Sequence, residues 1–260
     1  MRLLHGNTDG SFSLTTFPSN RTPCYAVLSH TWEADDQEVT FEDLVNGVGN
    51  LKSGYGKIRF CAERAQMDGL RYFWVDSCCI DKSSSAELSE AINTMFLWYQ
   101  NAAKCYVYLA DVRAGKSAGH QWESAFCRSR WFTRGWTLQE LLAPSSVEFF
   151  SQDGTKLGDK ESLKLQVHKV TGIAAHALQG SRLPQFSVEE RMSWAVRRET
   201  TIAEDHAYCL FGIFGVHLPL IYGEGKTNAL CRLRDEIDKR SEANSVKGNS
   251  AITIPEDIDS

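Results

Sequence analysis

The chain has 260 residues, a formal net charge of −5 at pH 7 and an ordinary share of apolar residues, which allows one large domain or a core with an added subdomain. The acidic balance argues against non-specific binding to nucleic acid, because such binding requires concentrated basic charge. No apolar run approaches the roughly 20 residues of a membrane helix, and no apolar signal region follows Met1. We therefore expect a cytoplasmic protein without a membrane span.

Short strand-like runs alternate with longer segments of helical period in the first part of the chain. We expect strands at Tyr25–Ser29, Tyr72–Asp76, Cys105–Leu109 and Val147–Phe150, and helices at 57–68, 87–101 and from Thr137 to a stop at Pro144. This alternation predicts right-handed crossovers onto a mostly parallel sheet, and hence an α/β fold of flavodoxin-like type with helices on its faces.

The pattern becomes helical from residue 152 onward. Residues 152–240 are predicted to form a helical extension on a core of about 20–151, with candidate helices at 161–171, 188–195, 205–214 and 226–239. Residues 241–260 lack a sustained apolar period, which predicts a disordered linker after a domain of residues 1–240. The linker indicates that the chain belongs to a longer protein.

The eight cysteines do not indicate a disulfide framework or a metal site. Several lie in apolar runs and are interpreted as small core residues, namely Cys24, Cys61, Cys105 and Cys209. The sequence contains no C-x-x-C pair and no H-E-x-x-H motif, so we expect no metal. Gly54-Tyr55-Gly56 lacks the third glycine and the preceding strand of a dinucleotide fingerprint, and we expect no bound cofactor.

Polar residues follow the predicted strands at the points where those strands end. Ser29, His30 and Trp32 follow the first strand, and Asp76 and Cys78 follow the second. The carboxyl ends of parallel strands meet at one edge, where such groups can bind a polar, partly aromatic small molecule. Each residue alone also fits a structural role: Ser29 and Asp76 as caps, His30 as a hydrogen-bonded loop residue and Cys78 as packing. Their common location is what indicates a binding site.

The segment RWFTRGWTLQELLAP at 130–144 places one carboxylate, Glu140, among aromatic and basic residues at the start of the short helix. Thr137 is predicted to cap that helix, whose N-terminus favours the ionised carboxylate. The neighbours offer flat faces to a planar or cationic ligand and guanidinium groups to its phosphates: Trp131, Phe132, Trp136, Arg130 and Arg134. The alternative is a helix packed by its tryptophans, with Glu140 in a salt bridge to one arginine.

Several blocks of this sequence resemble the fungal heterokaryon-incompatibility (HET) domain, as found at the N-terminus of nucleotide-binding, repeat-bearing incompatibility proteins. They are YAVLSHTW at 25–32, WVDSCCIDK at 74–82, RGWTLQELLAP at 134–144, EDHAYCLFGIF at 204–214 and YGEG at 222–225. The resemblance implies a cell-death effector of non-self recognition, joined to nucleotide-binding and repeat domains and acting through self-association. It does not by itself fix a reaction.

The block WTLQEL at 136–141 is similar to the catalytic block of Toll/interleukin-1 receptor (TIR) domains, and LSH at 28–30 looks like the end of their first strand. In NAD-cleaving TIR domains the glutamate of this block is catalytic. The similarity therefore implies the same role for Glu140, with NAD+ as substrate. Thr137 departs from the cysteine or serine of many TIR domains.

Around Glu140, the strand-end and helix residues would bind the substrate: Ser29, His30, Trp32, Asp76, Cys78, Arg134 and Trp136. In that arrangement Trp32 or Trp136 stacks on a ring of NAD+, and Arg134 meets the diphosphate. The competing hypothesis is a non-enzymatic interaction module that triggers cell death by recruiting partners.

Overall fold

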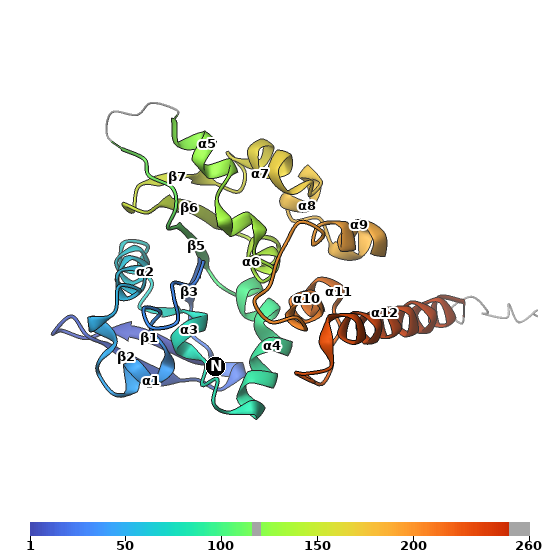
Figure 1. The fold of residues 1–260 in the computed structure, drawn as a ribbon, viewed down its shortest axis with the longest axis horizontal. Helices are drawn as coiled ribbons and strands as arrows, with labels where there is room; N and C mark the ends of the chain where they lie inside the picture. Colours follow the sequence, from blue (N-terminus) through green and yellow to red (C-terminus); the bar gives the residue numbers. More distant parts are fainter. Residues whose placement is uncertain (116–120, 250–260) are drawn as a thin grey trace, which may run out of the picture.

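The computed structural model of the chain describes residues 1–115 and 121–249, and its centre is a seven-stranded mixed sheet (Figure 1). The strand order is β2-β1-β4-β3-β5-β6-β7. The strands are β1 (Arg2–Gly6), β2 (Phe12–Thr16), β3 (Tyr25–His30), β4 (Tyr72–Trp74), β5 (Lys104–Leu109), β6 (Val147–Ser151) and β7 (Lys156–Asp159). The predicted α/β fold with a helical C-terminal region is confirmed.

The four central strands, β4-β3-β5-β6, run parallel and carry the site described below. β3 pairs with a strand on each side, and all six of its residues are buried, as expected for a central parallel strand that is apolar on both faces. Counted along the chain, these strands follow the flavodoxin-like order 2-1-3-4. The chain direction across the sheet therefore reverses between β3 and β5, and the carboxyl ends of those two strands flank the crevice where such sheets bind ligands.

Three outer strands were not expected from the sequence. β1 and β2 form an antiparallel hairpin whose inner strand joins the sheet through Leu4 opposite Phe73, and β7 pairs antiparallel with β6. β1 and β2 are short and carry His and Ser or Thr residues, while β7 has the sequence KLGD. Such polar edge strands give weak periodicity and take their structure from the neighbour that they pair with.

Helices cover both faces of the sheet, and α2 and α6 lie on opposite sides of it (Figure 1). α2 packs against β3 and β4, whereas α6 packs against β3 and α4. The α-helices of the core are α1 (Phe41–Val45), α2 (Tyr55–Met67), α3 (Asp76–Cys79), α4 (Ser85–Gln100), α5 (Gln121–Cys127) and α6 (Thr137–Leu142), with 3-10 turns η1 (Ser19–Arg21), η2 (Gly49–Leu51) and η3 (Arg130–Thr133). Asp76 begins α3 and does not extend the preceding strand.

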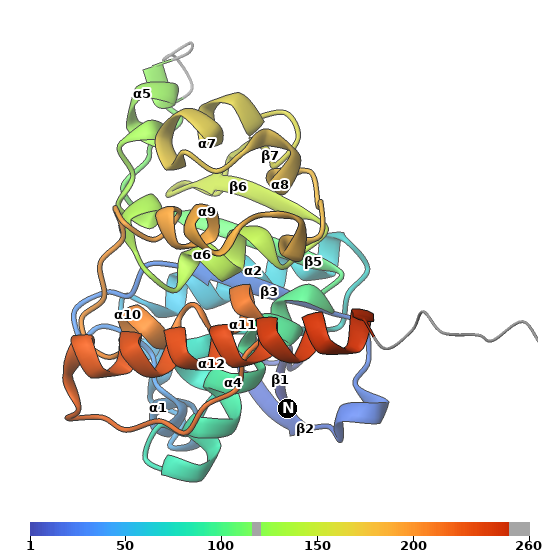
Figure 2. The ribbon, with the colours of Figure 1, turned by 90° about the vertical axis from the view of Figure 1, so that its right-hand side faces the viewer.

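The C-terminal part is helical, as the sequence predicts. It contains α7 (Lys164–Thr171), α8 (Ala175–Leu178), η4 (Leu183–Gln185), α9 (Val188–Ser193), α10 (Asp205–Tyr208), α11 (Phe211–Phe214) and α12 (Gly225–Asn249). The long α12, which runs across the view in Figure 2, packs against α10 and buries Ala229, Leu233 and Ile237. The linker boundary predicted at residue 241 falls inside this helix, and residues 250–260 of the predicted linker lie outside the described part.

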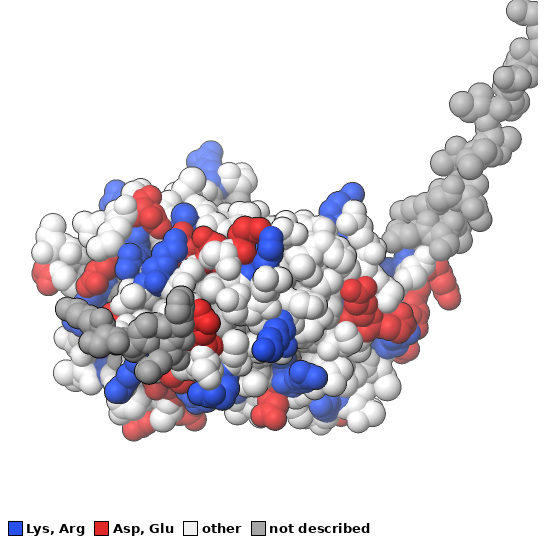
Figure 3. Space-filling view, turned by 90° about the horizontal axis from the view of Figure 1, so that it is seen from above, with Lys and Arg blue, Asp and Glu red and all other residues white. Residues whose placement is uncertain are grey.

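Cysteine burial follows the sequence prediction with one exception. Cys61, Cys105 and Cys209 are buried, whereas Cys24 is exposed, because it stands just before the paired residues of β3. All eight cysteines are free. Lys and Arg residues are interspersed with Asp and Glu residues on the face shown in Figure 3. In the described ranges, no helix is both long and apolar enough to cross a membrane.

Candidate functional site

Glu140 and Ser29 meet at the carboxyl end of β3, although they are 111 positions apart in the sequence. The Ser29 hydroxyl donates a hydrogen bond of 2.5 Å to Glu140 Oε2 and accepts one of 2.8 Å from Trp131 Nε1. Only 4% of the surface of Glu140 is exposed to solvent. The structure thus places two of the predicted site residues in direct contact, behind the rim of the sheet.

The environment of Glu140 favours its protonated form. Burial raises the pKa of Glu140 to about 8, and the nearby Asp76 carboxylate acts in the same direction, while the Ser29 hydrogen bond and Arg198 oppose the rise. The expectation that the helix N-terminus keeps this carboxylate ionised is therefore wrong. A six-residue helix supplies roughly 0.3–1 kcal/mol to an anion in its first turn, which the loss of solvent outweighs.

The start of α6 is held by Arg198, which the sequence prediction missed. Thr137 does not cap the helix; its hydroxyl donates to the carbonyls of Trp131 (2.6 Å) and Arg134 (2.9 Å). The Arg198 Nη1 atom donates to Thr137 Oγ1 at 2.8 Å and to the Arg134 carbonyl at 2.9 Å. Arg198 is 4% exposed, and its Nη2 atom is buried without a hydrogen-bond partner. A basic residue after a predicted helix gives no sequence signal for such a role.

The aromatic residues around Glu140 divide between core and rim. Trp131 and Phe132 are 0% and 4% exposed and pack with Phe126 and Phe149, so the expectation that they offer faces to a ligand is wrong. Their side chains fill the layer between the sheet and the loop before α6. Trp136 is half-buried and its Nε1 atom donates to Asp205 Oδ2 at 3.0 Å.

The two predicted phosphate-binding arginines remain near the surface. Arg134 is half-buried, and its Nη2 atom donates to Thr201 Oγ1 at 3.2 Å. Arg130 is exposed, and its backbone N–H donates to Asp111 at 2.8 Å. Burial raises the pKa of Asp205, and the charge of Arg134 opposes that rise. Arg134 therefore lies close to the carboxylate that accepts the Trp136 hydrogen bond, next to the candidate site.

His30 lies on the opposite face of the sheet from Ser29, because successive strand residues alternate. Its Nε2 atom is 3.1 Å from Glu38 Oε1, and Lys57 Nζ is 2.7 Å from Glu38 Oε2. Burial pushes the pKa of Glu38 upward, but His30 and Lys57 outweigh burial and hold that pKa below its usual range. His30 is the last residue of β3 and is buried, so its interpretation as a loop residue is wrong.

Asp76 and Trp32 form the exposed part of the site. The Trp32 indole N–H donates to Asp76 Oδ2 at 2.9 Å, and His30 Nδ1 lies 3.9 Å from Asp76 Oδ1. Lys82 places its ammonium 3.4 Å from the centre of the Trp32 ring. Cys78 is fully buried, and burial raises the pKa of its thiol well above the usual value, which fits packing and not a reactive thiolate.

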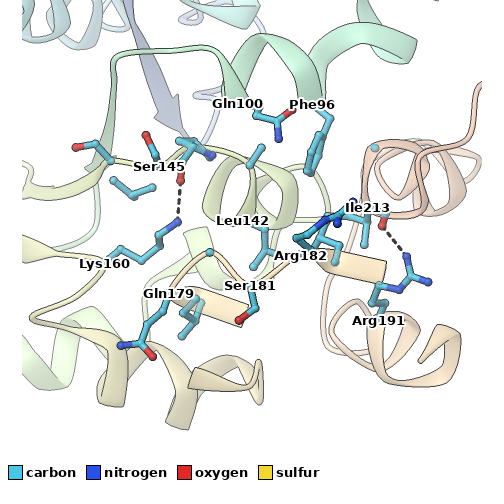
Figure 4. A pocket seen from close by; sticks show the side chains of 18 of the residues that line it. Phe96, Gln100, Leu142, Ser145, Lys160, Gln179, Ser181, Arg182, Arg191 and Ile213 are labelled. Atoms are coloured by element: carbon cyan, nitrogen blue, oxygen red, sulfur yellow. Dashed lines mark hydrogen bonds between the residues drawn. The ribbon is translucent and has the colours of Figure 1, made fainter. Parts of the chain in front are cut away.

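A cavity of about 860 Å³ lies at the other edge of the sheet, away from Glu140 (Figure 4). Its wall includes Lys104 and Val147, which start β5 and β6, and the end of α6 at Leu142. Figure 4 shows Arg191 directed to the carbonyl of Ile213, a hydrogen bond of 3.0 Å. The residue set predicted from the sequence therefore lies at the carboxyl edge, while this cavity lies at the amino edge.

Residues 25–121 match the sequence model of the heterokaryon incompatibility protein (HET) family. The chain is also 57% identical over 243 residues to the vegetative incompatibility protein HET-E-1 of Podospora anserina, which covers 92% of this chain. The chain belongs to the HET family. It spans 18% of the length of that relative, so HET-E-1 is a much longer protein. No solved structure matches the chain.

Three of the eight candidate site residues of this HET domain, Glu140 included, lie outside the segment that the family model matches. Ser29, His30, Trp32, Asp76 and Cys78 lie inside residues 25–121, whereas Arg134, Trp136 and Glu140 come later. The similarity to HET-E-1 extends over both groups. Among residues 1–115 and 121–249, no group of three or more His, Cys, Asp or Glu side chains is arranged to hold a metal ion.

Proposed function

We propose that this chain is a cell-death effector of fungal heterokaryon incompatibility and that it cleaves NAD+ at the bond between nicotinamide and ribose. The biological role is supported by membership of the HET family and by the similarity to a vegetative incompatibility protein. The reaction is supported by one observation: a buried carboxylate, Glu140, is hydrogen-bonded to Ser29 near the carboxyl end of β3, at the edge where parallel sheets bind ligands.

One carboxylate is sufficient for this reaction because nicotinamide in NAD+ is a cationic leaving group that departs as a neutral molecule. No general acid is required, and the ribose develops oxocarbenium-like charge that an anionic Glu140 would stabilise. The bond between C1 of the ribose and the nicotinamide nitrogen breaks, its electron pair leaves with nicotinamide, and water supplies the hydroxyl group of ADP-ribose and one proton to solvent.

The raised pKa of Glu140 gives this proposal a pH dependence. At pH 7 most Glu140 side chains in the free protein are protonated, because the pKa is raised to about 8. The active form is the ionised one, so kcat/KM for NAD+ rises with pH toward about 8. A bound pyridinium cation favours the carboxylate, which shifts the corresponding rise in kcat to lower pH.

The surrounding residues would bind and orient the dinucleotide. The partly exposed indoles of Trp32 and Trp136 would stack on its rings, and the partly exposed Arg134 would bind its diphosphate. Asp76 fixes the Trp32 indole through the 2.9 Å hydrogen bond. Ser29 and Trp131 fix the carboxylate.

The second candidate function is a non-enzymatic interaction module that causes cell death by recruiting partners. The burial of Glu140 favours this reading, since an acid that is 4% exposed and hydrogen-bonded to Ser29 can serve as a structural group. In that case the rim residues, Trp32 and Trp136, would contact a partner protein and no nicotinamide would be released.

Incubation of the purified domain with NAD+ separates the two functions. We expect release of nicotinamide and about a 10²–10³-fold loss in Glu140→Gln, because a single charge-stabilising group has effects of that size. Glu148→Gln is the matched control, because Glu148 is at the start of β6 and pairs with Lys104 at 2.9 Å. A domain that releases no nicotinamide in any tested state of association, or a Glu140→Gln variant that keeps full activity, would exclude the catalytic role.

We also propose that activity requires self-association, supplied in a longer protein by nucleotide-binding and repeat domains joined to this one. A neighbouring copy would close over the rim and exclude water from the bound dinucleotide, and clustering would raise the local concentration of the domains. Turnover per molecule should rise with protein concentration or with a fused dimerising tag. Constant turnover per molecule, in a preparation shown to be monomeric at every concentration, would rule out this requirement.

A further inference from the structure

The exposed indole of Trp32 already carries a cation. Trp32 is 40% exposed, and the Lys82 ammonium lies 3.4 Å from the centre of its ring. Lys82 comes from the turn after α3 and Trp32 from the turn after β3, so the contact joins two strand-end loops. The distance is typical of a cation–π contact, in which the negative face of the ring attracts a positive charge.

The ring is fixed while the ammonium is held weakly. The hydrogen bond of 2.9 Å from the Trp32 indole to Asp76 sets the orientation of the ring. Within residues 1–115 and 121–249, no carboxylate oxygen forms an ion pair with Lys82. The aromatic face is a partner of this ammonium in the described part of the chain, and a cation that binds the face more strongly can displace it.

Carboxylates near the ring offset part of the cost of placing a positive charge there. Burial lowers the pKa of Lys82, while the carboxylates of Asp76, Glu38 and Asp205 act in the opposite direction and stabilise its ammonium. His30 Nδ1, which is buried without a hydrogen-bond partner, lies 3.9 Å from the Asp76 carboxylate that accepts the Trp32 hydrogen bond. A planar cation can use the whole indole face, whereas an ammonium covers only its centre.

We propose that the Trp32 face is a binding site for a planar aromatic cation and that Lys82 is an internal competitor for it. If the proposed function holds, this cation is the pyridinium ring of oxidised NAD+. The reduced dinucleotide carries a neutral ring and gains no cation–π attraction, so it cannot displace Lys82 by that means. The site then selects the oxidised dinucleotide, and Lys82 sets the concentration at which that dinucleotide enters.

The experiment measures binding of 1-methylnicotinamide, a planar cation without phosphates, by isothermal titration calorimetry. Lys82→Met removes the competitor and should tighten binding about fivefold, in line with the strength of one partly exposed cation–π contact. Neutral nicotinamide should bind with the same affinity to both proteins. Lys169→Met, which removes an exposed lysine on α7, is the matched control and should leave binding of both compounds unchanged.

Two variants of the ring test the site itself. Trp32→Leu should abolish the preference for the cation, and Trp32→Phe should keep part of it, with thermal melting used to verify that each variant is folded. Equal or weaker binding of 1-methylnicotinamide to Lys82→Met would overturn the proposal, as would an undiminished preference for the cation in folded Trp32→Leu. The assay requires no bond cleavage, so a protein that fails to cleave NAD+ but shows these affinities refutes the proposed function alone.

Discussion

The two ends of helix α6 reach opposite edges of the parallel sheet, and one buried basic side chain holds each end. At the start of the helix Arg198 donates to Thr137 Oγ1 and to the Arg134 carbonyl. At its end Lys160 Nζ donates to the carbonyls of Leu141 (3.3 Å) and Pro144 (2.7 Å). A cation near the last carbonyls of a helix is favourable, whereas a cation near its start works against the helix dipole.

The two edges otherwise differ in kind. The carboxyl edge buries carboxylates, Glu140 and Glu38, whose pKa values move in opposite directions. The amino edge holds the cavity of about 860 Å³, but its buried lysine, Lys160, is satisfied by backbone carbonyls. Open volume and perturbed acids therefore lie apart in this protein. Under the proposed function, catalysis would depend on buried acids with shifted pKa values, which require exclusion of water. It would not depend on the cavity at the amino edge.

Arg198→Met should have the largest effect and tests the hydrogen bonds that Arg198 makes at the start of α6. The substitution leaves the Thr137 hydroxyl and the Arg134 carbonyl without their donor and removes the positive charge beside Glu140. We expect a loss of about 3 kcal/mol in the free energy of unfolding, measured with urea. In the folded fraction, the rise of NAD+ turnover with pH should move to higher pH. An unchanged pH profile would show that Arg198 has no electrostatic connection to Glu140.

The pH dependence of stability should show the next largest effect. The pKa of Glu140 is about 8 in the folded protein, against an ordinary value of 4.5 that applies to the unfolded chain. Between pH 4.5 and about pH 8 the folded state therefore binds more protons than the unfolded state. The stabilising contribution of its protonated form is complete below about pH 4.5 and is lost as the pH rises through about 8. Between about pH 5.5 and pH 7.5, wild type should lose about 2 kcal/mol relative to Glu140→Gln. Parallel stability curves for the two proteins would contradict the raised pKa.

Lys160→Met should have a smaller effect, confined to stability. The change leaves the Leu141 and Pro144 carbonyls without their buried donor, which we expect to cost about 1.5 kcal/mol in the free energy of unfolding. NAD+ turnover per folded molecule should match wild type, because the Glu140 side chain bonds to Ser29 and the charges that shift its pKa are those of Asp76 and Arg198. A fall in turnover as large as that in Arg198→Met would show that Arg198 and Lys160 do not differ in their effect on the site.

Arg182→Ala should have the smallest effect and tests the cavity at the amino edge. Arg182 is exposed and lines that cavity. Its removal should change stability by less than about 0.5 kcal/mol and leave NAD+ turnover and 1-methylnicotinamide affinity unchanged. A marked loss of turnover without a loss of stability would place the reaction at the amino edge and reverse the comparison.

The sequence is sufficient to predict the parallel core because β3, β5 and β6 are apolar runs of ordinary strand length. It also predicts that Ser29 and Glu140 share a site, through the strand-end rule and the resemblance to TIR domains. The outer strands escape prediction, since β7 has polar residues and depends on pairing with β6. Local patterns carry information about what a segment buries, but not about which segment covers it.

The partners of the site residues are the part that the sequence could not supply. No local pattern indicates that Lys57 is buried against Glu38 or that Lys82 lies on the Trp32 ring. Trp131 reads as a ligand-binding ring, yet its exposed fraction is 0%. Each assignment depends on contacts between residues far apart in the chain, where no single-sequence period exists. Arg198 is the extreme case, because its 61-position separation from Thr137 joins the helical extension to the core.

The backbone pairing beside Arg198 has a consequence for the order in which the protein folds. The Gly135 amide donates to the Glu199 carbonyl at 2.8 Å, and the Glu199 amide donates to the Thr133 carbonyl at 2.6 Å, just before α6. These bonds form only after residue 199 has been synthesised, and contacts of high sequence separation form late in folding. A nascent or truncated chain that ends before residue 199 therefore lacks the backbone pairing that positions the start of α6. Under the proposed function, such an incomplete chain would not yet cleave NAD+.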